Sequence, residues 1–390
     1  MTSTGSKRLN FKVLSSPKGA GIVMLMAMLL ALAWVNSPWS GSYELVHHAP
    51  LTISLGNMTL GKPLILWINE GLMVFFFFLI GLEIKREVSE GQLSSLSQVI
   101  LPGFGAVGGM IFPALIYIYF NQNDPENLRG WAVPVATDIV LALALLSMLG
   151  NRVPIALKVF LTALAIFDDV GTLIVVATFY SEGLSIPALL IAAAGLAAAV
   201  ALNRLKVAKI APYALLGVFL WLAILESGVH ATIAGFLLAL TIPMKVDGKE
   251  VLKPLEHNLT PWISLGVVPV FAFFNAGIRL SDLSAETLFG PISIGVILGL
   301  FLGKQAGVML GVFLAIKLKF SRLPADVSWP QIYGASVLTG VGFTMGLFVV
   351  GLAFEKPGII LSTNFSILVG SIISAILGMV VLMKFSPRPS

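Results

Sequence analysis

The sequence predicts an all-α polytopic membrane protein with about twelve transmembrane helices. Of its 390 residues 57% are hydrophobic and only 11% are charged, and the mean hydropathy is +0.96. Soluble domains, in contrast, are about 25% charged. Many apolar runs are long enough to cross a bilayer, which takes about 20 residues per helix. These runs lack the period-2 alternation of membrane β-barrel strands, so helices are expected.

Twelve apolar runs follow one another along the chain. Their cores are residues 19–35, 64–82, 98–120, 131–149, 155–180, 186–202, 211–225, 228–243, 259–275, 291–316, 332–353 and 361–383. The seventh and eighth runs are short and are separated only by ESG. The loops are short, so residues 1–390 are expected to form one membrane domain with tails at 1–18 and 384–390. The first run resembles a signal peptide, but it is long for one, and its removal would leave an odd number of spans.

Lys and Arg are distributed unevenly between the two sides of the predicted spans. With a cytoplasmic N-terminus, nineteen of these residues are cytoplasmic and one, Lys304, lies within a span. The external ones are Lys62, Arg129, Arg279 and Lys356. Cytoplasmic loops carry the excess of Lys and Arg, so both termini are expected in the cytoplasm. This topology explains the net charge of +5, and no nucleic-acid partner is indicated. The chain has no cysteine, which excludes disulfides and thiolate metal sites.

The longest external connection, residues 36–63, contains a hairpin signal. In LTISLGNMTL two β-prone stretches flank Gly56-Asn57, a pair that favours a tight hairpin turn. The short β-hairpin is expected either to cover the external face or to pair through its free edge with a second copy of the chain. His47 and His48 lie in the same loop and are expected to be solvated.

Spans four and eleven carry helix-breaking residues near their middle. In GWAVPVATDIVLALALLSMLG, Pro134 lies shortly before Thr137 and Asp138, and in GASVLTGVGFTMGLFVVG, Gly340 and Gly342 lie at the centre. Proline removes a backbone donor and glycine loosens a helix. Each broken span is the middle one of three, which predicts two inverted repeats, spans three to five and ten to twelve. Paired broken spans indicate the binding site of a transporter.

Asp168 and Asp169 are adjacent inside VFLTALAIFDDVGTLIVVATF, a run with no other charge. One charge at the centre of a bilayer costs about 2.5–3.5 kcal/mol on insertion scales. Asp138 and Lys304 bring the number of mid-span charges to four. A salt bridge with Lys304 accounts for one aspartate but not for three, so the carboxylates are expected to bind ions or protons.

Asp138 and Lys304 have a second explanation, because a broken helix exposes partial dipole charges that opposite charges neutralise. Whether Lys304 pairs with Asp168 or with Asp138 is left open. Carboxylates, the Thr137 hydroxyl and freed carbonyls suit a hard cation such as Na⁺ or Li⁺, and no cofactor is expected. An intramembrane aspartyl protease is an alternative, but adjacent residues point about 100° apart on a helix and cannot form its dyad. A cation channel is the other alternative.

Six titratable residues near the span ends form a further candidate set: Glu83, Arg86, Glu87, His230, Glu256 and His257. The first three have the i, i+3, i+4 spacing of one helix face. They either anchor the helix at the interface or form a funnel that attracts cations and titrates with pH. Glu256 and His257 carry the same ambiguity. His230 is expected to be either a satisfied buried histidine or a pH-sensitive gate.

Over nearly its whole length the chain resembles the NhaA-type Na⁺/H⁺ antiporters of bacteria. The matching segments are LWINEGLMVFFFFLIGLEIKRE, GWAVPVATDIVLALALL, LTALAIFDDVGTLIV, SGVHATIAGF, PVFAFFNAGI, GLFLGKQAGV and LTGVGFTMGLF. The resemblance implies that Asp168 and Asp169 bind the ion with Lys304 opposite. It also implies that the two broken helices cross beside Thr137, Asp138 and Lys304.

The same resemblance implies exchange of cytoplasmic Na⁺ or Li⁺ for external H⁺ across the bacterial inner membrane, in contact with lipid. Two carboxylates that lose two protons to bind one cation predict electrogenic exchange of two H⁺ per Na⁺. The resemblance further implies pH regulation through the six titratable residues and a homodimer joined through the 45–60 hairpin. Thr260 stands where some relatives carry a second histidine, so their pH profile is not expected to transfer.

Overall fold

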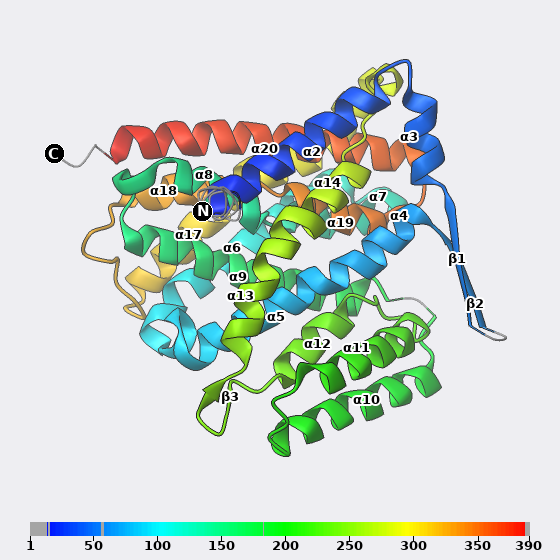
Figure 1. Ribbon diagram of the computed structural model, residues 1–390. Coiled ribbons are helices and arrows are strands. Elements are labelled where there is room, and N and C mark those ends of the chain that lie inside the picture. The colour runs from blue at the N-terminus through cyan, green and yellow to red at the C-terminus, as the bar shows by residue number, and fades with distance from the viewer. Residues whose placement is uncertain (1–13, 15, 56–57, 182, 387–390) are drawn as a thin grey trace, which may run out of the picture. The chain divides into compact units, whose positions relative to one another are not determined.

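The structure is a computed structural model that describes residues 14, 16–55, 58–181 and 183–386 (Figure 1). Most of the expected N-terminal tail, the last four residues of the C-terminal tail and the Gly56-Asn57 turn lie outside these residues. The described chain divides into two compact units. Unit 1 comprises Met1–Met26, Gln92–Thr172 and Ile278–Ser390, and unit 2 comprises Ala27–Gly91 and Leu173–Gly277.

Unit 1 contains predicted spans three and four, most of span five, and spans ten to twelve. Its elements are the start of α2 (Pro17–Val35), η2 (Gln92–Ser94), α6 (Leu96–Asn121), α7 (Pro125–Leu128), η3 (Arg129–Val135), α8 (Ile139–Met148), η4 (Gly150–Arg152), most of α9 (Ile155–Phe179), η6 (Leu280–Asp282), α15 (Ala285–Phe289), α16 (Pro291–Leu298), η7 (Gly299–Gly303), α17 (Lys304–Lys317), α18 (Trp329–Leu338), α19 (Phe343–Ala353) and α20 (Pro357–Phe385). Apart from the end of span five, the two predicted triplets of spans therefore fall in one unit.

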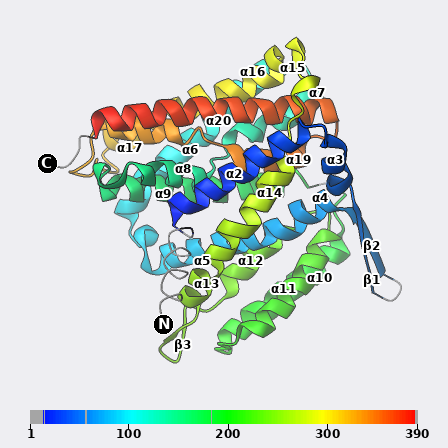
Figure 2. The same cartoon turned by 45° about the horizontal axis from the view of Figure 1, so that its top comes forward.

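Unit 2 contains the remaining elements, the end of α2 and the end of α9. They are α3 (Ser40–His47), β1 (Pro50–Leu55), β2 (Met58–Pro63), α4 (Leu64–Trp67), η1 (Ile68–Leu72), α5 (Met73–Glu90), α10 (Ile186–Arg204), α11 (Ile210–Leu225), α12 (Ile233–Thr241), β3 (Lys245–Val246), β4 (Lys249–Glu250), α13 (Leu252–Trp262), η5 (Ile263–Val267) and α14 (Val268–Asn275). In this unit α10 and α11 lie side by side (Figures 1 and 2), and their buried side chains form one hydrophobic cluster with α12.

Nine helices among the described residues are long and apolar enough to cross a membrane. A tenth candidate is the bent pair of α18 and α19, whose axes differ by 42° across the Thr339–Gly342 break. The seventh and eighth predicted spans hold shorter helices, α11 with 16 residues and α12 with 9. The chain is thus a helical multi-pass membrane protein.

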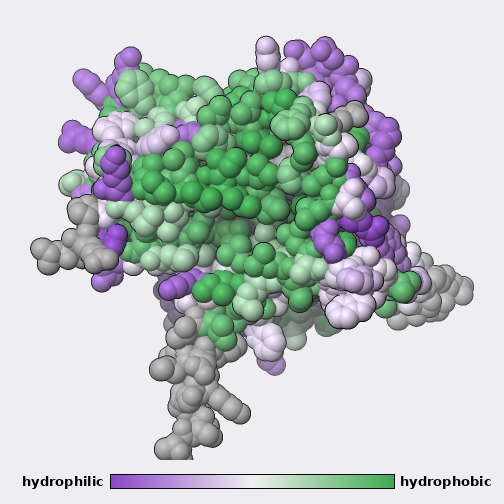
Figure 3. Space-filling view, turned by 90° about the horizontal axis from the view of Figure 1, so that it is seen from above, coloured by the Kyte–Doolittle hydropathy of each residue, from purple (hydrophilic) through white to green (hydrophobic). Residues whose placement is uncertain are grey.

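The surface of the structure fits a lipid environment. Figure 3 shows hydrophobic side chains over the middle of the visible face and hydrophilic ones gathered toward its margins. The exposed side chains of α20 include Ile372, Ile376, Val380 and Met383. An exposed apolar surface of this kind would be unfavourable in water and is satisfied by acyl chains.

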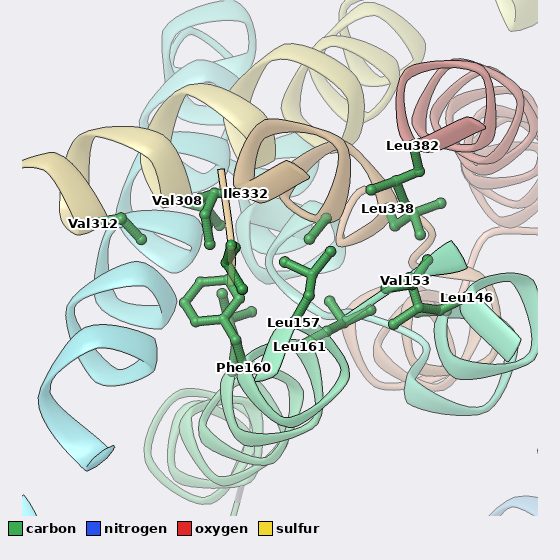
Figure 4. Close-up of a cluster of buried hydrophobic side chains, with 14 of the residues drawn as sticks. Leu146, Val153, Leu157, Phe160, Leu161, Val308, Val312, Ile332, Leu338 and Leu382 are labelled. Carbon is green, nitrogen blue, oxygen red and sulfur yellow. The ribbon is translucent and has the colours of Figure 1, made fainter. Parts of the chain in front are cut away.

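A hydrophobic core in unit 1 joins α8, α9, α17, α18 and α20 (Figure 4). Leu157 and Leu161 of α9 point toward Ile332 and Leu338 of α18, and Val308 of α17 lies beside them. This core continues along α9 to Leu164, one helical turn before the adjacent aspartates. It therefore fixes the helix that carries these carboxylates against the helix that begins at Lys304.

Glycines bring α6 and α17 unusually close together. A Cβ atom added at Gly108 would lie 2.1 Å from the carbonyl oxygen of Gly307, and one added at Gly311 would lie 2.0 Å from that of Phe104. No side chain fits at these distances, so both positions require glycine. Close approach through small residues is a common way to pack membrane helices. Here it sets the position of the helix that begins at Lys304.

The strands β1 and β2 form an antiparallel pair that extends away from α3 and α4 (Figures 1 and 2). Their register runs from Pro50 opposite Pro63 to Leu55 opposite Met58. Among the described residues these two strands form a sheet of their own. Each strand consequently has one free edge.

His47 is not the solvated residue that the sequence predicts. It is half-buried, its Nε2 lies 3.1 Å from the carbonyl oxygen of Phe274, and its ring stacks on Tyr43. The Tyr43 hydroxyl donates to the carbonyl oxygen of Phe273 at 2.8 Å, so the end of α14 fixes both side chains. His48 stays exposed, as expected. The prediction failed for His47 because a loop position gives no sign of packing against α14.

We expect the histidine contact to make unit 2 sensitive to acid. Burial, and to a smaller extent the neighbouring His48, lowers the pKa of His47 below its usual 6.5. Below pH 6.5 the unfolded chain then binds more protons than the folded one, so stability falls as pH falls toward the lowered pKa. The thermal unfolding midpoint should drop between pH 7 and pH 5, and the drop should be smaller in His47→Gln. His257→Gln, which changes an exposed histidine, should behave as wild type, and equal drops in all three proteins would contradict this account.

Candidate functional site

Five residues of the predicted ion site lie in unit 1, and each is almost completely buried. Thr137, Asp168 and Lys304 are 0% exposed, Asp138 is 1% exposed and Asp169 is 2% exposed. Burial at this depth removes charged groups from water, which is costly unless they are paired or hydrogen-bonded. The contacts that these groups make therefore determine what the site can do.

Asp168 and Asp169 lie near the middle of α9, and Lys304 begins α17. Lys304 follows the π-helical segment η7, an irregularity that is frequent at functional sites. Its Nζ donates a short hydrogen bond to Oδ2 of Asp168, and Asp169 also lies within electrostatic range of the ammonium group. This contact answers the question that the sequence leaves open, because Lys304 pairs with Asp168 rather than with Asp138.

Thr137, in the break of span four, connects Asp168 to the break of span eleven. Its Oγ1 lies 2.6 Å from Oδ2 of Asp168 and 2.9 Å from the carbonyl oxygen of Thr339. A hydroxyl carries one hydrogen, so it donates to only one of the two acceptors at a time. When Asp168 is ionised the hydroxyl can donate to it. When Asp168 is protonated it can itself donate to Oγ1, and the Thr137 hydrogen is then free for the Thr339 carbonyl.

The two breaks contact each other. In span four the 3₁₀-helix η3 ends at Val135 and α8 begins at Ile139, and in span eleven α18 ends at Leu338 and α19 begins at Phe343. Between them the backbone N–H of Asp138 donates to the carbonyl oxygen of Val341 at 2.6 Å. Each break thus satisfies a polar backbone group of the other, which a lipid environment requires.

The Asp138 carboxylate caps the N-terminal ends of two half-helices. Oδ1 accepts from the Leu141 N–H of α8 at 3.0 Å, and Oδ2 accepts from the Thr344 N–H of α19 at 2.9 Å. The Thr344 hydroxyl donates to the same Oδ2 at 2.6 Å. A negative charge is favourable at a helix N-terminus, where backbone N–H groups are unpaired. These contacts match the helix-end explanation of Asp138.

Sequence reasoning missed Thr344, Thr339 and Ser371 at this site. Thr344 contacts Asp138, the Thr339 carbonyl contacts Thr137, and Ser371 of α20 accepts from the Gly342 N–H at 3.2 Å. A hydroxyl residue is common in membrane helices, so its presence alone is a weak signal. Thr344 follows Gly342 by two residues in a broken span, and this position next to the break is the one signal that points to it.

Four of the six titratable residues meet in unit 2. Arg86 donates through Nε to both carboxylate oxygens of Glu256, at 3.0 and 2.8 Å, and its Nη1 lies 2.6 Å from Oε1 of Glu87. Glu83 lies within electrostatic range of Arg86, Glu87 and Glu256. One guanidinium therefore holds three carboxylates around it, and this cluster is only partly exposed.

The other two titratable residues do not join this cluster. His257 is exposed on α13 next to Glu256. His230 bonds the Thr232 hydroxyl at 2.7 Å and is within electrostatic range of Lys62, which pairs with Glu70 at 2.6 Å. Glu70 and Arg86 are sixteen residues apart on one helical segment, roughly 24 Å at 1.5 Å per residue. The six residues that the sequence predicts to regulate by pH therefore lie at two separate positions, one around Arg86 and one around His230.

The fold and the buried site define a helical multi-pass membrane protein with charged groups at two interrupted spans. Comparison with known proteins agrees: the family model described as Na⁺/H⁺ antiporter 1 matches residues 11–382. The Na(+)/H(+) antiporter NhaA of Maricaulis maris is 62% identical over 380 residues, 97% of this chain and 94% of that protein. The protein of the same name from Shewanella amazonensis is 47% identical over 378 residues, 96% of this chain and 97% of that protein.

The chain belongs to the NhaA family of Na⁺/H⁺ antiporters, and it is a transporter rather than an enzyme. The aspartyl protease alternative is thereby excluded. The sodium proton antiporter MjNhaP1 from Methanocaldococcus jannaschii, solved at pH 8, has a similar fold with a TM-score of 0.55. The match covers 95% of this chain and 93% of that chain at 12% sequence identity. This similarity supports the fold alone. Among the described residues no cluster of three or more His, Cys, Asp or Glu side chains forms a metal site.

Proposed function

We propose that this protein is an electrogenic antiporter that exchanges cytoplasmic Na⁺ or Li⁺ for external H⁺. The observation that carries the proposal is the pair of adjacent buried carboxylates, Asp168 and Asp169, beside the buried ammonium of Lys304. These groups can bind either protons or a hard cation but not both at full occupancy. Family membership supports the two ions, because the relatives are named for Na⁺ and H⁺.

In the proposed cycle a cation enters when the carboxylates are ionised and leaves when they take up protons. Oδ2 of Asp168 already accepts from Lys304 and Thr137. A cation that binds Asp168 therefore competes with the Lys304 ammonium. Two protons leave for each cation, and this count is the same whether the second proton leaves the Asp168 carboxyl or the ammonium. Competition for one site couples the two fluxes without a third component.

Two protons entering for each Na⁺ that leaves move one positive charge inward. With a membrane potential of about 100 mV, negative inside, each cycle gains about 2.3 kcal/mol for cation extrusion. Alternating access would come from movement of one group of helices against the other. We propose that the two broken spans cross at the site, that spans three to five and ten to twelve are inverted repeats, and that α11 and α12 complete twelve spans.

Inverted membrane vesicles provide the direct test. Addition of Na⁺ or Li⁺ to vesicles with a preformed pH gradient should dissipate that gradient, and a potential-sensitive dye should report net charge movement. Proton flux should be twice the cation flux. Electroneutral exchange would overturn the two-proton count, and cation flux without proton flux would favour the channel alternative.

We further propose that Arg86, Glu83, Glu87 and Glu256 regulate exchange by pH together with His230 and the exposed His257. The support is the cluster of three carboxylates around one guanidinium, a group whose charge balance changes as protons bind. Thr260 donates to the Glu256 carbonyl at 2.8 Å and does not titrate near neutrality. A pH titration of Na⁺-dependent exchange in Arg86→Gln tests the assignment, and an unchanged profile would contradict it.

We propose that the protein is a homodimer joined through the 45–60 hairpin, in the bacterial inner membrane with both termini cytoplasmic. The strands β1 and β2 have free edges that favour pairing with another strand. Replacing residues 50–63 by a short Gly-Ser linker should convert the purified dimer into a monomer by light scattering while Na⁺-dependent exchange persists. A dimer that survives this deletion would contradict the role of the hairpin.

A further inference from the structure

Thr172 has a buried hydroxyl that the site described above does not use. It lies on α9, is 1% exposed, and its Oγ1 has no hydrogen-bond partner among the residues that the structure describes. Oδ1 of Asp168, four residues earlier, also lacks one within the described part of the chain. Buried polar atoms nearly always find a partner, and one that does not requires an explanation such as a bound ion.

The other threonines of α9 show that the helix itself offers a partner. Thr162 donates to the carbonyl oxygen of Lys158 at 2.9 Å, and Thr178 donates to that of Ile174 at 2.8 Å. Both use the acceptor four residues earlier, which is the usual solution for a threonine in a helix. Thr172, the most buried of the three, does not use the corresponding carbonyl of Asp168. Its hydroxyl is therefore not satisfied by the helix backbone as those of Thr162 and Thr178 are.

Helix geometry sets this hydroxyl beside both carboxylates. With about 100° per residue, Thr172 lies about 40° around the helix from Asp168 and about 60° from Asp169, between the two directions and one turn further along the axis. Side chains at i, i+3 and i, i+4 positions are neighbours on a helix surface. The three side chains thus present carboxylate and hydroxyl oxygens on one side of α9.

We infer that Thr172 is a further ligand of the transported cation, through Oγ1, beside Asp168 and Asp169. The inference rests on the proposed antiport function and adds a residue to its binding site. A neutral hydroxyl oxygen suits a hard monovalent cation, because it replaces one water of the hydration shell without adding a third negative charge. A cation ligand also explains why this hydroxyl has no partner among the residues that the structure describes.

The test compares Thr172→Val, which removes the hydroxyl at nearly constant shape, with Thr172→Ser, which keeps it. In inverted vesicles Thr172→Val should raise the apparent KM for Na⁺ about tenfold, the effect of about 1.4 kcal/mol, with the maximal rate within twofold of wild type. Thr172→Ser should stay within twofold of wild type in KM. Thr162→Val, whose hydroxyl bonds the helix backbone, is the matched control and should leave KM unchanged.

Thermal unfolding of the purified protein separates a ligand role from a structural one. In choline chloride Thr172→Val should unfold at the wild-type temperature or above it, because an apolar isostere replaces a buried unpaired hydroxyl. The rise in midpoint on adding NaCl should be smaller than in wild type, since a bound ligand stabilises the folded state according to its affinity. A wild-type KM and Na⁺ response in Thr172→Val would overturn the Thr172 assignment alone. A wild type with neither Na⁺-dependent exchange nor a Na⁺ response would overturn the antiport function with it.

Discussion

Replacing Asp169 by Asn is expected to reduce Na⁺-dependent proton exchange by about a hundredfold or more. The substitution keeps the size of the side chain but removes one negative charge from a site that is 2% exposed to solvent. A hundredfold reduction corresponds to about 2.8 kcal/mol of lost interaction with the transported ions, because each 1.4 kcal/mol is a factor of ten. Asn also cannot take up a proton, so both the cation and the proton lose a binding group in one step.

The assay is dissipation of a preformed pH gradient in inverted vesicles on addition of Na⁺ or Li⁺. Asp169→Asn should show neither proton nor charge movement while its amount in the membrane and its thermal unfolding midpoint stay close to wild type. Asp326→Asn, which removes an exposed carboxylate of unit 1, is the matched control and should transport normally. If Asp169→Asn exchanged ions at the wild-type rate, Asp169 would not be part of the binding site. The proposed count of two protons per cation would then have no basis.

Asp168→Asn should abolish exchange as well, but with a loss of stability that Asp169→Asn does not share. Asp168 accepts from both Lys304 and Thr137, and its loss leaves a buried ammonium without its partner. The comparison therefore separates the two adjacent carboxylates by their effects on folding, although their sequence positions are equivalent.

The sequence indicated most of this site through the cost of burying charge in lipid. Asp138, Asp168, Asp169 and Lys304 stand out because each interrupts an apolar run, and Pro134 marks the nearby break. The pairing of Lys304 with Asp168 was not predictable, since it depends on how α17 packs against α6 and α9. Two glycine contacts, at Gly108 and Gly311, set that packing, and no local pattern gives their partners.

The titratable residues show the same limit. Helical spacing predicted that Glu83, Arg86 and Glu87 share a face, and the structure adds Glu256 from α13 to them. It separates His230, which lies near Lys62 at the other end of the helical segment. Spacing along one helix is a local property, whereas the grouping of residues from different helices depends on tertiary contacts. For the same reason the sequence could not show that the two breaks satisfy each other's backbone.

Replacing Lys304 by Met is expected to destabilise the protein by about 3–5 kcal/mol, the usual cost of removing one partner of a buried ion pair. Met has a similar length and keeps the apolar stem, so the effect comes from the charge that Asp168 is left to carry alone in a site with 0% exposure. The thermal unfolding midpoint in detergent should fall sharply. Lys317→Met on the same helix, which removes an exposed ammonium, should change the midpoint little.

The double variant Asp168→Asn/Lys304→Met provides the decisive comparison. With both members of the pair removed, neither Asp168 nor Lys304 leaves the other as an unpaired buried charge, so the unfolding midpoint should return toward that of wild type even though the variant cannot transport. The stability losses of the two single variants then add up to more than the loss in the double variant. The difference measures the coupling between the two groups. Additive losses would contradict the pairing of Lys304 with Asp168. Recovery of the midpoint without recovery of exchange would instead separate the two roles of this ion pair, because the same contact that stabilises the fold is the one that an entering cation must displace.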